Sequence, residues 1–232
     1  MSNRIHPTAI IGPGVELGDE NIVGPYAVLV GPCRIGDRNW IGPHVTIGTP
    51  AEDRGAPHPA AWDGELDGPG VEIGSDNRLR EYVSLNQGTK APTRLGNGCY
   101  LLQNSHVSHD GVVGDEVTMA HSVQLGGHVR VWSYANLGMN AVVHQYGRVG
   151  PGAMVGMGST VRHEAQAFMV SVGSPVRAIR INEVGLRRRG CAPEAIEGLA
   201  SYLNSVGELP AGLPADLADL LKRWTDRPPI AG

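Results

Sequence analysis

The chain has 232 residues and is 41% hydrophobic, but aromatic residues make up only 5% and include a single Phe. It contains 33 Gly and 17 Pro, without the strict every-third-residue Gly of collagen. The formal net charge of −4 gives no indication of nucleic acid or an anionic membrane as the main partner. Composition therefore predicts a turn-rich globular protein with an aliphatic core.

Two further features bear on where the protein works. The three cysteines, Cys33, Cys99 and Cys191, are odd in number and far apart, which favours a reduced, cytosolic protein. The first residues lack a signal-like apolar run, and no stretch approaches the length needed to span a bilayer. We expect a cytoplasmic protein without integral membrane association.

An aliphatic residue recurs every six positions along most of the chain. The series comprises Ile5, Ile11, Leu17, Val23, Leu29, Ile35, Ile41, Ile47, Ile73, Leu79, Leu85, Leu95, Leu101, Val107, Val113, Met119, Leu125, Val131, Leu137, Val143, Val149, Val155 and Val161. A period of six fits neither an amphipathic helix nor a two-sided strand, but it is typical of a β-solenoid. Three flat faces of six residues make a coil of eighteen, and these 23 positions support roughly seven to eight coils.

Gly follows more than half of these aliphatic positions. We expect it to supply the backbone dihedrals of the corners between faces, which residues with a Cβ reach reluctantly. Asn21, Asn39, Asn77 and Asn97 are expected to serve in the same way.

The period is interrupted twice, across a Pro-rich loop at 48–72 and again from Asn86 to Arg94. It fades after Val161, and helical spacing begins at Pro193 with Ile196, Leu199, Leu203 and Val206, followed by a second helix from Pro214 with Leu217, Leu220, Leu221 and Trp224. We therefore expect a β-helix over residues 1–170, then a connecting segment and a helical C-terminal cap over 171–232.

The eighteen-residue coil also aligns polar residues in neighbouring coils. His109, Gly127 and Gln145 form one column, Asp110 and His128 form the next, and His144 precedes Gln145. These residues are expected to line one outer edge over three coils.

Each of these histidines, taken singly, is also compatible with a tolerated surface residue. Together they favour acid–base chemistry, because a carboxylate such as Asp110 can orient a neighbouring imidazole such as His109 that removes a proton from a hydroxyl. Gly127 would bring a backbone N–H close to a reacting carbonyl. A zinc site like that of gamma-class carbonic anhydrases needs two His five residues apart, and no such pair occurs among the histidines from 106 to 144. We therefore expect no metal.

With these residues in view, the chain resembles the acyl-carrier-protein-dependent UDP-N-acetylglucosamine O-acyltransferases that open lipid A biosynthesis. The resemblance covers nearly the whole length, and the His-x-x-His-Asp, Gly-Gly-His-Val and Val-His-Gln motifs at these spacings are specific to that group. The matching segments are Ile5–Ile10, Asn77–Glu81, Asn104–Asp110, Leu125–Val129, Ala141–Gln145 and Gly185–Gly190.

The resemblance implies a left-handed parallel β-helix, a homotrimer with active sites between subunits, and no bound cofactor. The donor would be acyl carrier protein with its 4'-phosphopantetheine thioester, and the acceptor a UDP-sugar. His109 would be the general base on the sugar 3-hydroxyl, Asp110 would orient it, and Gly127 N–H would hold the oxyanion. The residues expected to bind substrate are Asp53, His106, His128, His144, Gln145, Met157, Asn182, Arg188 and Arg189.

Met157 matches the position where the family sets acyl length, so its bulk predicts a medium rather than long 3-hydroxyacyl chain.

The polypeptide departs from the family pattern at Val184, where an acidic residue is usual, at Gly55, where a Lys is expected, and at Asn86–Gln87. These departures concern the acceptor and the carrier protein more than the fold.

Two other functions remain open at this stage. Gly173–Arg177 is similar to the segment after the coils of many hexapeptide acetyltransferases, which favours acetyl transfer from coenzyme A to a sugar or amino sugar. A related acyl or acetyl transfer to a different nucleotide sugar or other small acceptor is part of the same alternative. A non-catalytic trimeric scaffold would retain the same repeat. The His109–Asp110 pair argues against the scaffold, and the Arg187–Arg189 run favours the carrier-dependent transfer.

Overall fold

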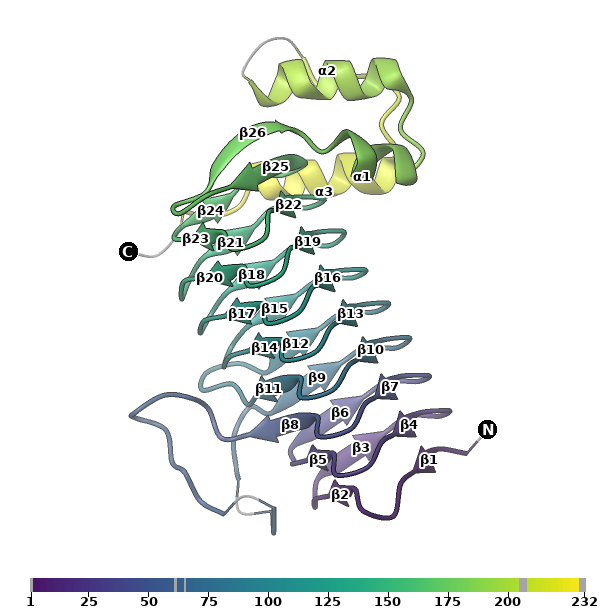
Figure 1. The fold of residues 1–232 in the computed structure, drawn as a ribbon, viewed down its shortest axis with the longest axis vertical. Coiled ribbons are helices and arrows are strands. Elements are labelled where there is room, and N and C mark those ends of the chain that lie inside the picture. Colours follow the sequence, from purple (N-terminus) through teal and green to yellow (C-terminus); the bar gives the residue numbers. More distant parts are fainter. Residues whose placement is uncertain (1, 61, 65, 205–207, 230–232) are drawn as a thin grey trace.

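The computed structural model describes residues 2–60, 62–64, 66–204 and 208–229. Short strands wind into a three-sided prism with a helical cap at its C-terminal end (Figure 1). Consecutive strands belong to three different sheets, which we name A, B and C in the order in which the chain enters them. Adjacent strands of each sheet are parallel, apart from the final hairpin of sheet A.

The ten strands of sheet A are β1 (Arg4–Ile5), β4 (Ile22–Val23), β7 (Trp40–Ile41), β10 (Arg78–Leu79), β13 (Tyr100–Leu101), β16 (Thr118–Met119), β19 (Asn136–Leu137), β22 (Met154–Val155), β25 (Met169–Val172) and β26 (Arg177–Ile181). The eight strands of sheet B are β2 (Ile10–Ile11), β5 (Val28–Leu29), β8 (Thr46–Thr49), β11 (Ser84–Asn86), β14 (His106–Val107), β17 (Gln124–Leu125), β20 (Val142–Val143) and β23 (Thr160–Val161). The eight strands of sheet C are β3 (Val15–Leu17), β6 (Cys33–Ile35), β9 (Val71–Ile73), β12 (Thr93–Leu95), β15 (Val112–Val113), β18 (Arg130–Val131), β21 (Arg148–Val149) and β24 (Glu164–Ala165). These strands make eight complete coils, with β25 beginning a ninth.

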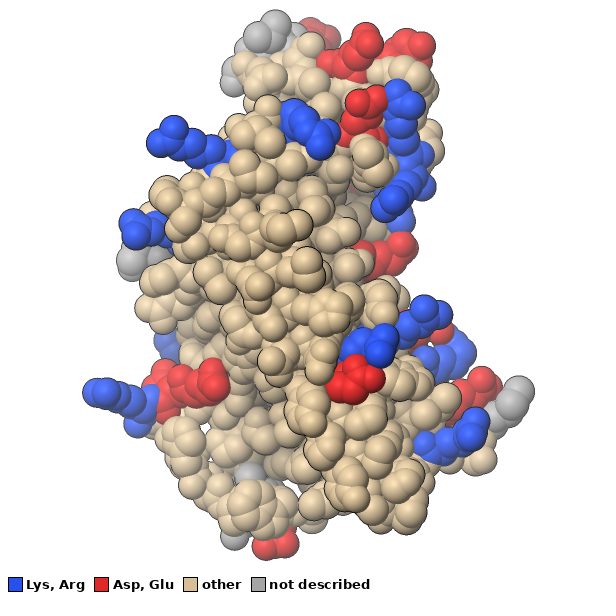
Figure 2. Space-filling model, in the orientation of Figure 1, with Lys and Arg blue, Asp and Glu red and all other residues tan. Residues whose placement is uncertain are grey.

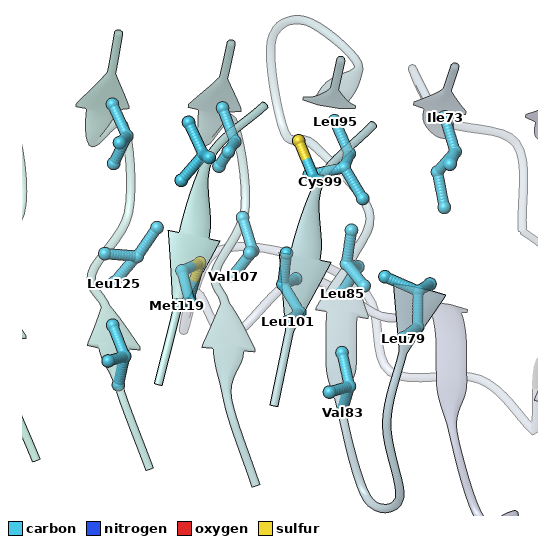
Figure 3. Close-up of a cluster of buried hydrophobic side chains, with 14 of the residues drawn as sticks. Ile73, Leu79, Val83, Leu85, Leu95, Cys99, Leu101, Val107, Met119 and Leu125 are labelled. Carbon is cyan, nitrogen blue, oxygen red and sulfur yellow. The ribbon is translucent and has the colours of Figure 1, made fainter. Parts of the chain in front are cut away.

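The six-residue period exists because one aliphatic residue per strand points inward. From Val23 to Val161 every residue of the series is buried, and the side chains stack along the prism axis (Figure 3). Fully burying one such side chain is worth about 1.5–3 kcal/mol. The three members in the first coil, which no earlier coil covers, are less buried: Ile11 and Leu17 are half-buried, and Ile5 is 45% exposed.

The glycines of the repeat work differently from the expectation. Apart from Gly48, those that follow an aliphatic position do not have positive φ; a Cβ there would collide with the next coil, as at Gly18, where it would lie 2.9 Å from the Gly36 carbonyl. The left-handed backbone of the corners falls instead on larger residues, including Asp110 (φ 57°) and His128 (φ 60°). Close approach of coils, rather than dihedral freedom, therefore selects Gly.

Asn21, Asn39 and Asn77 also differ from the expectation, because they are buried inside the prism. Asn39 Nδ2 donates to Asn21 Oδ1 at 3.0 Å, and Asn77 Nδ2 donates to Asn39 Oδ1 at 2.9 Å. The resulting ladder satisfies buried backbone groups in consecutive coils.

The C-terminal cap contains α1 (Glu183–Arg188), α2 (Pro193–Leu203) and α3 (Ala215–Thr225). The helix starts expected at Pro193 and Pro214 agree with α2 and with the Pro214 N-cap of α3; Val206 lies outside the described residues. The β25–β26 hairpin and α1 were not foreseen, because the repeat fades there. Within the described residues, no helix has the length and apolar character needed to cross a membrane.

Candidate active site

The corners between sheets form three ridges along the prism, which we name A–B, B–C and C–A. His109 and Asp110 follow β14 on the B–C ridge, and Gly127 and His128 follow β17 one coil later. The N–H of His128 donates to the His109 carbonyl at 2.9 Å, and the N–H of Tyr146 donates to the Gly127 carbonyl at 2.9 Å. Residues eighteen apart on the B–C ridge therefore stack in neighbouring coils, as the sequence predicts.

His109 and Asp110 form a close pair. His109 Nδ1 lies 2.9 Å from Asp110 Oδ2, and the two residues are only 8% and 9% exposed. Burial by itself raises the pKa of Asp110, but hydrogen bonds from His109 and from the backbone of Thr89, Ala91 and Lys90 outweigh it, so the pKa lies well below its usual range. An ionised Asp110 requires a proton on His109 Nδ1, which leaves Nε2 as the basic nitrogen.

Gly127 lies directly against that nitrogen. A Cβ at residue 127 would be 2.5 Å from His109 Nε2 and 2.6 Å from Cε1, so only Gly leaves room for the ring. Among the described residues no protein acceptor takes the Gly127 N–H. This amide is therefore available to a ligand beside the basic nitrogen.

His128 completes the group. Its ring meets that of His109 edge-on at 5.1 Å between centroids, and its Nε2 lies 3.9 Å from Asp110 Oδ2. Burial lowers the pKa of His128, opposed in part by the charge of Asp110. Tyr146 stacks on His128 at 4.6 Å. Sequence reasoning missed Tyr146, although its position eighteen residues after His128 was a usable signal.

The remaining residues expected near this ridge lie around it. His106 points outward from β14, where Nδ1 is 2.8 Å from Ser84 Oγ and Nε2 is 3.1 Å from Glu52 Oε2. Burial lowers the pKa of His106, with Glu52 acting in the opposite direction. His144 and Gln145 are exposed one coil above Gly127.

Asp53 belongs to the loop between β8 and β9, and its negative charge raises the pKa of His128 in opposition to burial. It accepts a hydrogen bond from the Gly55 N–H at 2.6 Å.

A groove of about 1100 Å³ leads from the ridge across sheet C to α3. Asp110, His128 and Tyr146 lie at one end of it. Its cationic lining consists of Lys90, Arg94, Arg130, Arg148, Lys222, Arg223 and Arg227.

Asn182, Arg188 and Arg189 lie on a different ridge, C–A, around a cavity of about 550 Å³ beneath α1. Asn182 caps α1 by accepting from the Gly185 N–H at 3.2 Å. The Arg189 guanidinium is 2.7 Å from Glu116 and 3.3 Å from the centre of the Tyr134 ring.

Met157 lies on the third ridge, A–B, after β22, and is 73% exposed. The expected site residues are thus distributed over all three ridges of one chain. A single protomer does not bring Met157, Arg189 and His109 together.

His109, Asp110 and His128 also offer one metal-donor atom each within 4.8 Å of one another. However, His109 Nδ1 and Asp110 Oδ2 are hydrogen-bonded to each other, and both Asp110 oxygens accept from the 89–91 backbone. Because these donors are already engaged, we interpret the cluster as an acid–base group, and the absence of a catalytic metal stays a prediction.

Comparison with known proteins gives relatives of one kind, although no protein-family model matches. An acyl-[acyl-carrier-protein]–UDP-N-acetylglucosamine O-acyltransferase from Thiobacillus denitrificans is 37% identical over 216 residues, which are 84% of this chain and 81% of the relative. The enzyme of the same name from Alkalilimnicola ehrlichii is 44% identical over 132 residues, 56% of this chain; the match spans about half, 51%, of that relative.

Solved structures show the same likeness. LpxA from Acinetobacter baumannii superposes with a TM-score of 0.70 at 29% identity, covering 95% of this chain and 88% of that one. LpxA from Bacteroides fragilis, a UDP-N-acetylglucosamine acyltransferase, gives 0.74 at 26% identity, covering 97% and 95%. The predicted fold class, a left-handed parallel β-helix with a helical C-terminal end, is confirmed. From its coils and these relatives, the chain belongs to the acyl-[acyl-carrier-protein]–UDP-N-acetylglucosamine O-acyltransferase family.

Proposed function

We propose that the protein transfers a 3-hydroxyacyl group from acyl carrier protein to the 3-hydroxyl of UDP-N-acetylglucosamine in the cytoplasm, as in the first step of lipid A biosynthesis. One observation carries the proposal: the basic nitrogen of a carboxylate-oriented His109 faces a glycine backbone on an outer ridge. The names of the relatives supply the substrate class.

In this mechanism His109 Nε2 removes the proton of the sugar 3-hydroxyl as the oxygen attacks the thioester carbonyl. The Gly127 N–H donates to the oxyanion of the tetrahedral intermediate. Asp110 stabilises the imidazolium without taking its proton. Collapse of the intermediate forms the ester and breaks the carbon–sulfur bond, and the imidazolium proton passes to the leaving thiolate.

We further propose a homotrimer, in which a neighbouring copy completes each site. Asn182, Arg188 and Arg189 would bind the nucleotide part, and Met157 would limit the acyl chain, from ridges that one chain holds apart from His109. The outward residues of sheet B support an interface between copies because none is charged; they are Ile10, Val28, Thr46, Ser84, His106, Gln124, Val142 and Thr160. Figure 2 likewise shows one face of the prism with an uncharged centre.

The carrier protein would approach along the cationic groove. The groove is open to solvent and ends at Asp110 and His128. Its lining has seven basic side chains and three carboxylates, Asp110, Asp219 and Asp226, and this excess of positive charge suits an acidic carrier that delivers a phosphopantetheine thioester.

The test is to incubate the purified protein with UDP-N-acetylglucosamine and either a 3-hydroxyacyl carrier thioester or acetyl-CoA. We expect product only with the carrier thioester, and a fall in kcat of about a thousandfold for His109→Ala. His6→Ala, an exposed histidine after β1 in the first coil, is the control. Product only with acetyl-CoA would favour the acetyltransferase alternative, and full turnover by His109→Ala would contradict the mechanism. Light scattering gives the oligomeric state.

A further inference from the structure

The second interruption of the repeat lies immediately beside the His109–Asp110 pair. Between β10 and β13 the spacing of paired residues is 22, as for Arg78 and Tyr100, instead of eighteen. The additional residues fall at the B–C corner between β11 and β12, and segment 87–92 covers the ridge there.

This segment directs consecutive donors at one carboxylate. Asp110 Oδ2 accepts from the Thr89 N–H at 2.9 Å and from Thr89 Oγ1 at 2.8 Å. Asp110 Oδ1 accepts from the N–H groups of Lys90 at 2.8 Å and Ala91 at 2.9 Å. With His109 Nδ1, the carboxylate accepts five hydrogen bonds, which fix its position and orientation.

The shape of the turn depends on Gly88. A Cβ at residue 88 would lie 1.6 Å from the Ala91 carbonyl oxygen and 3.3 Å from Asp110 Oδ1. The turn is therefore closed tightly enough that its N–H groups converge on the carboxylate.

A purely structural role, in which Asp110 only ties down an insertion, is the alternative. Glu116 and Tyr146 are also corner residues with left-handed backbone and keep their side chains exposed, whereas Asp110 is buried under this turn. The same oxygen, Oδ2, accepts from both Thr89 Oγ1 and His109 Nδ1, so any displacement of the carboxylate moves the imidazole.

We propose that Thr89 is a positioning residue: its hydroxyl, with the 89–91 backbone, holds Asp110 so that His109 keeps its proton on Nδ1 and presents Nε2 beside Gly127. The catalytic consequence rests on the proposed acyl transfer, whereas the positioning itself does not. Thr89→Val removes one hydrogen-bond donor to Asp110. It leaves in place the charged or titratable groups nearby, which are Lys90, Asp53, His106 and His128.

The direct measurement is the NMR signal of the His109 Nδ1 proton, assigned by its loss in His109→Gln. In Thr89→Val we expect this signal to shift or broaden, and kcat to fall about tenfold with KM values within about twofold, as for the loss of one hydrogen bond to a charged group. Thr89→Ser keeps the hydroxyl and should restore both readouts. Thr118→Val, on the outer face of sheet A, is the matched control and should change neither.

An unchanged Nδ1 proton signal in folded Thr89→Val, checked by thermal unfolding, would overturn the proposal whatever the rate. If the wild-type protein transfers no acyl group, the proposed function fails, but the proton signal still decides whether Thr89 positions the pair.

Discussion

The B–C and C–A ridges are built from the same repeat, yet they present different chemistry. On the B–C ridge the ionisable pair His109–Asp110 is buried and its hydrogen bonds are short and numerous. On the C–A ridge Arg189 is paired with Glu116 beside an open cavity of about 550 Å³. A proton transfer needs donor and acceptor held in a fixed geometry. A charged ligand at the C–A ridge would instead replace Glu116 as the ionic partner of Arg189.

The difference arises from what interrupts the coils. At the B–C ridge an insertion within the solenoid, segment 87–92, folds over a corner and removes it from solvent. At the C–A ridge α1 comes from after the solenoid and leaves space beneath it. The regular coils therefore fix which residues lie side by side on a ridge. The irregular segments, 87–92 and α1, determine whether those residues are buried or line a cavity.

The largest loss of activity on the B–C ridge is expected for Asp110→Asn. An amide can present its NH₂ group to His109 Nδ1 and favour a proton on Nε2, so kcat should fall about a thousandfold while the fold is retained. Steady-state kinetics and circular dichroism provide the measurements. A loss of less than about tenfold would mean that orientation of His109 by Asp110 is unimportant.

Gly127→Ala tests the close approach on the same ridge. Its Cβ would meet the pinned His109 ring, so we expect about a hundredfold loss of kcat and a lower melting temperature. In a His109→Ala background the ring is absent, and the same change should have little effect on melting. An equal effect on melting in both backgrounds would contradict the proposed contact.

The hydrogen bonds accepted by ionised Asp110 predict a pH dependence of stability. Its pKa is below the ordinary value of 3.8, so its stabilising contribution is fully present above that value and is lost as pH falls through the folded pKa. Urea unfolding should show wild type more stable than Asp110→Asn by about 2 kcal/mol at pH 7, with the gap closing in acid below about pH 3.8. Asp219→Asn, which removes an exposed carboxylate, should show no such gap.

On the C–A ridge we expect substitutions to change substrate binding rather than the rate of turnover. Arg189→Ala is expected to raise KM for UDP-N-acetylglucosamine about tenfold with kcat nearly unchanged, because it removes contacts made equally in ground and transition states. Arg187→Ala, in the same basic run but outside the lining of the cavity, is the matched control. A fall in kcat at constant KM would place Arg189 in the chemical step.

The smallest effect is expected at the A–B ridge. Met157→Gly should shift the preference toward longer 3-hydroxyacyl donors by about threefold to tenfold, since it removes an exposed thioether proposed to limit the pocket. Donors of different chain length in competition give the ratio, with Met139→Gly one coil below as the control. Equal or better wild-type activity with fourteen-carbon donors would contradict a medium-chain preference.

The period of six determined much of the fold, because an inward aliphatic residue such as Leu101 or Val107 is required at every strand. The eighteen-residue coil length placed His109, Gly127 and Gln145 in one column, since parallel coils fix which residues stack. The acid–base role of His109 and the backbone role of Gly127 were expected from the residues, the family resemblance made both roles specific, and all the assigned roles stay predictions. The expectation that the repeated Gly supplies corner dihedrals is wrong. These glycines are required by close contact between neighbouring coils, which is a property of the tertiary structure.

The coil, its faces and the ridge on which the acid–base residues lie can be read from the amino-acid sequence, because they follow from a local repeat. The folded chain was needed to show that the 89–91 backbone encloses Asp110 and that Tyr146 stacks on His128. It was also needed to show that Arg189 and Met157 lie on other ridges than His109. These features depend on the path of irregular segments, where no period relates sequence distance to distance in space.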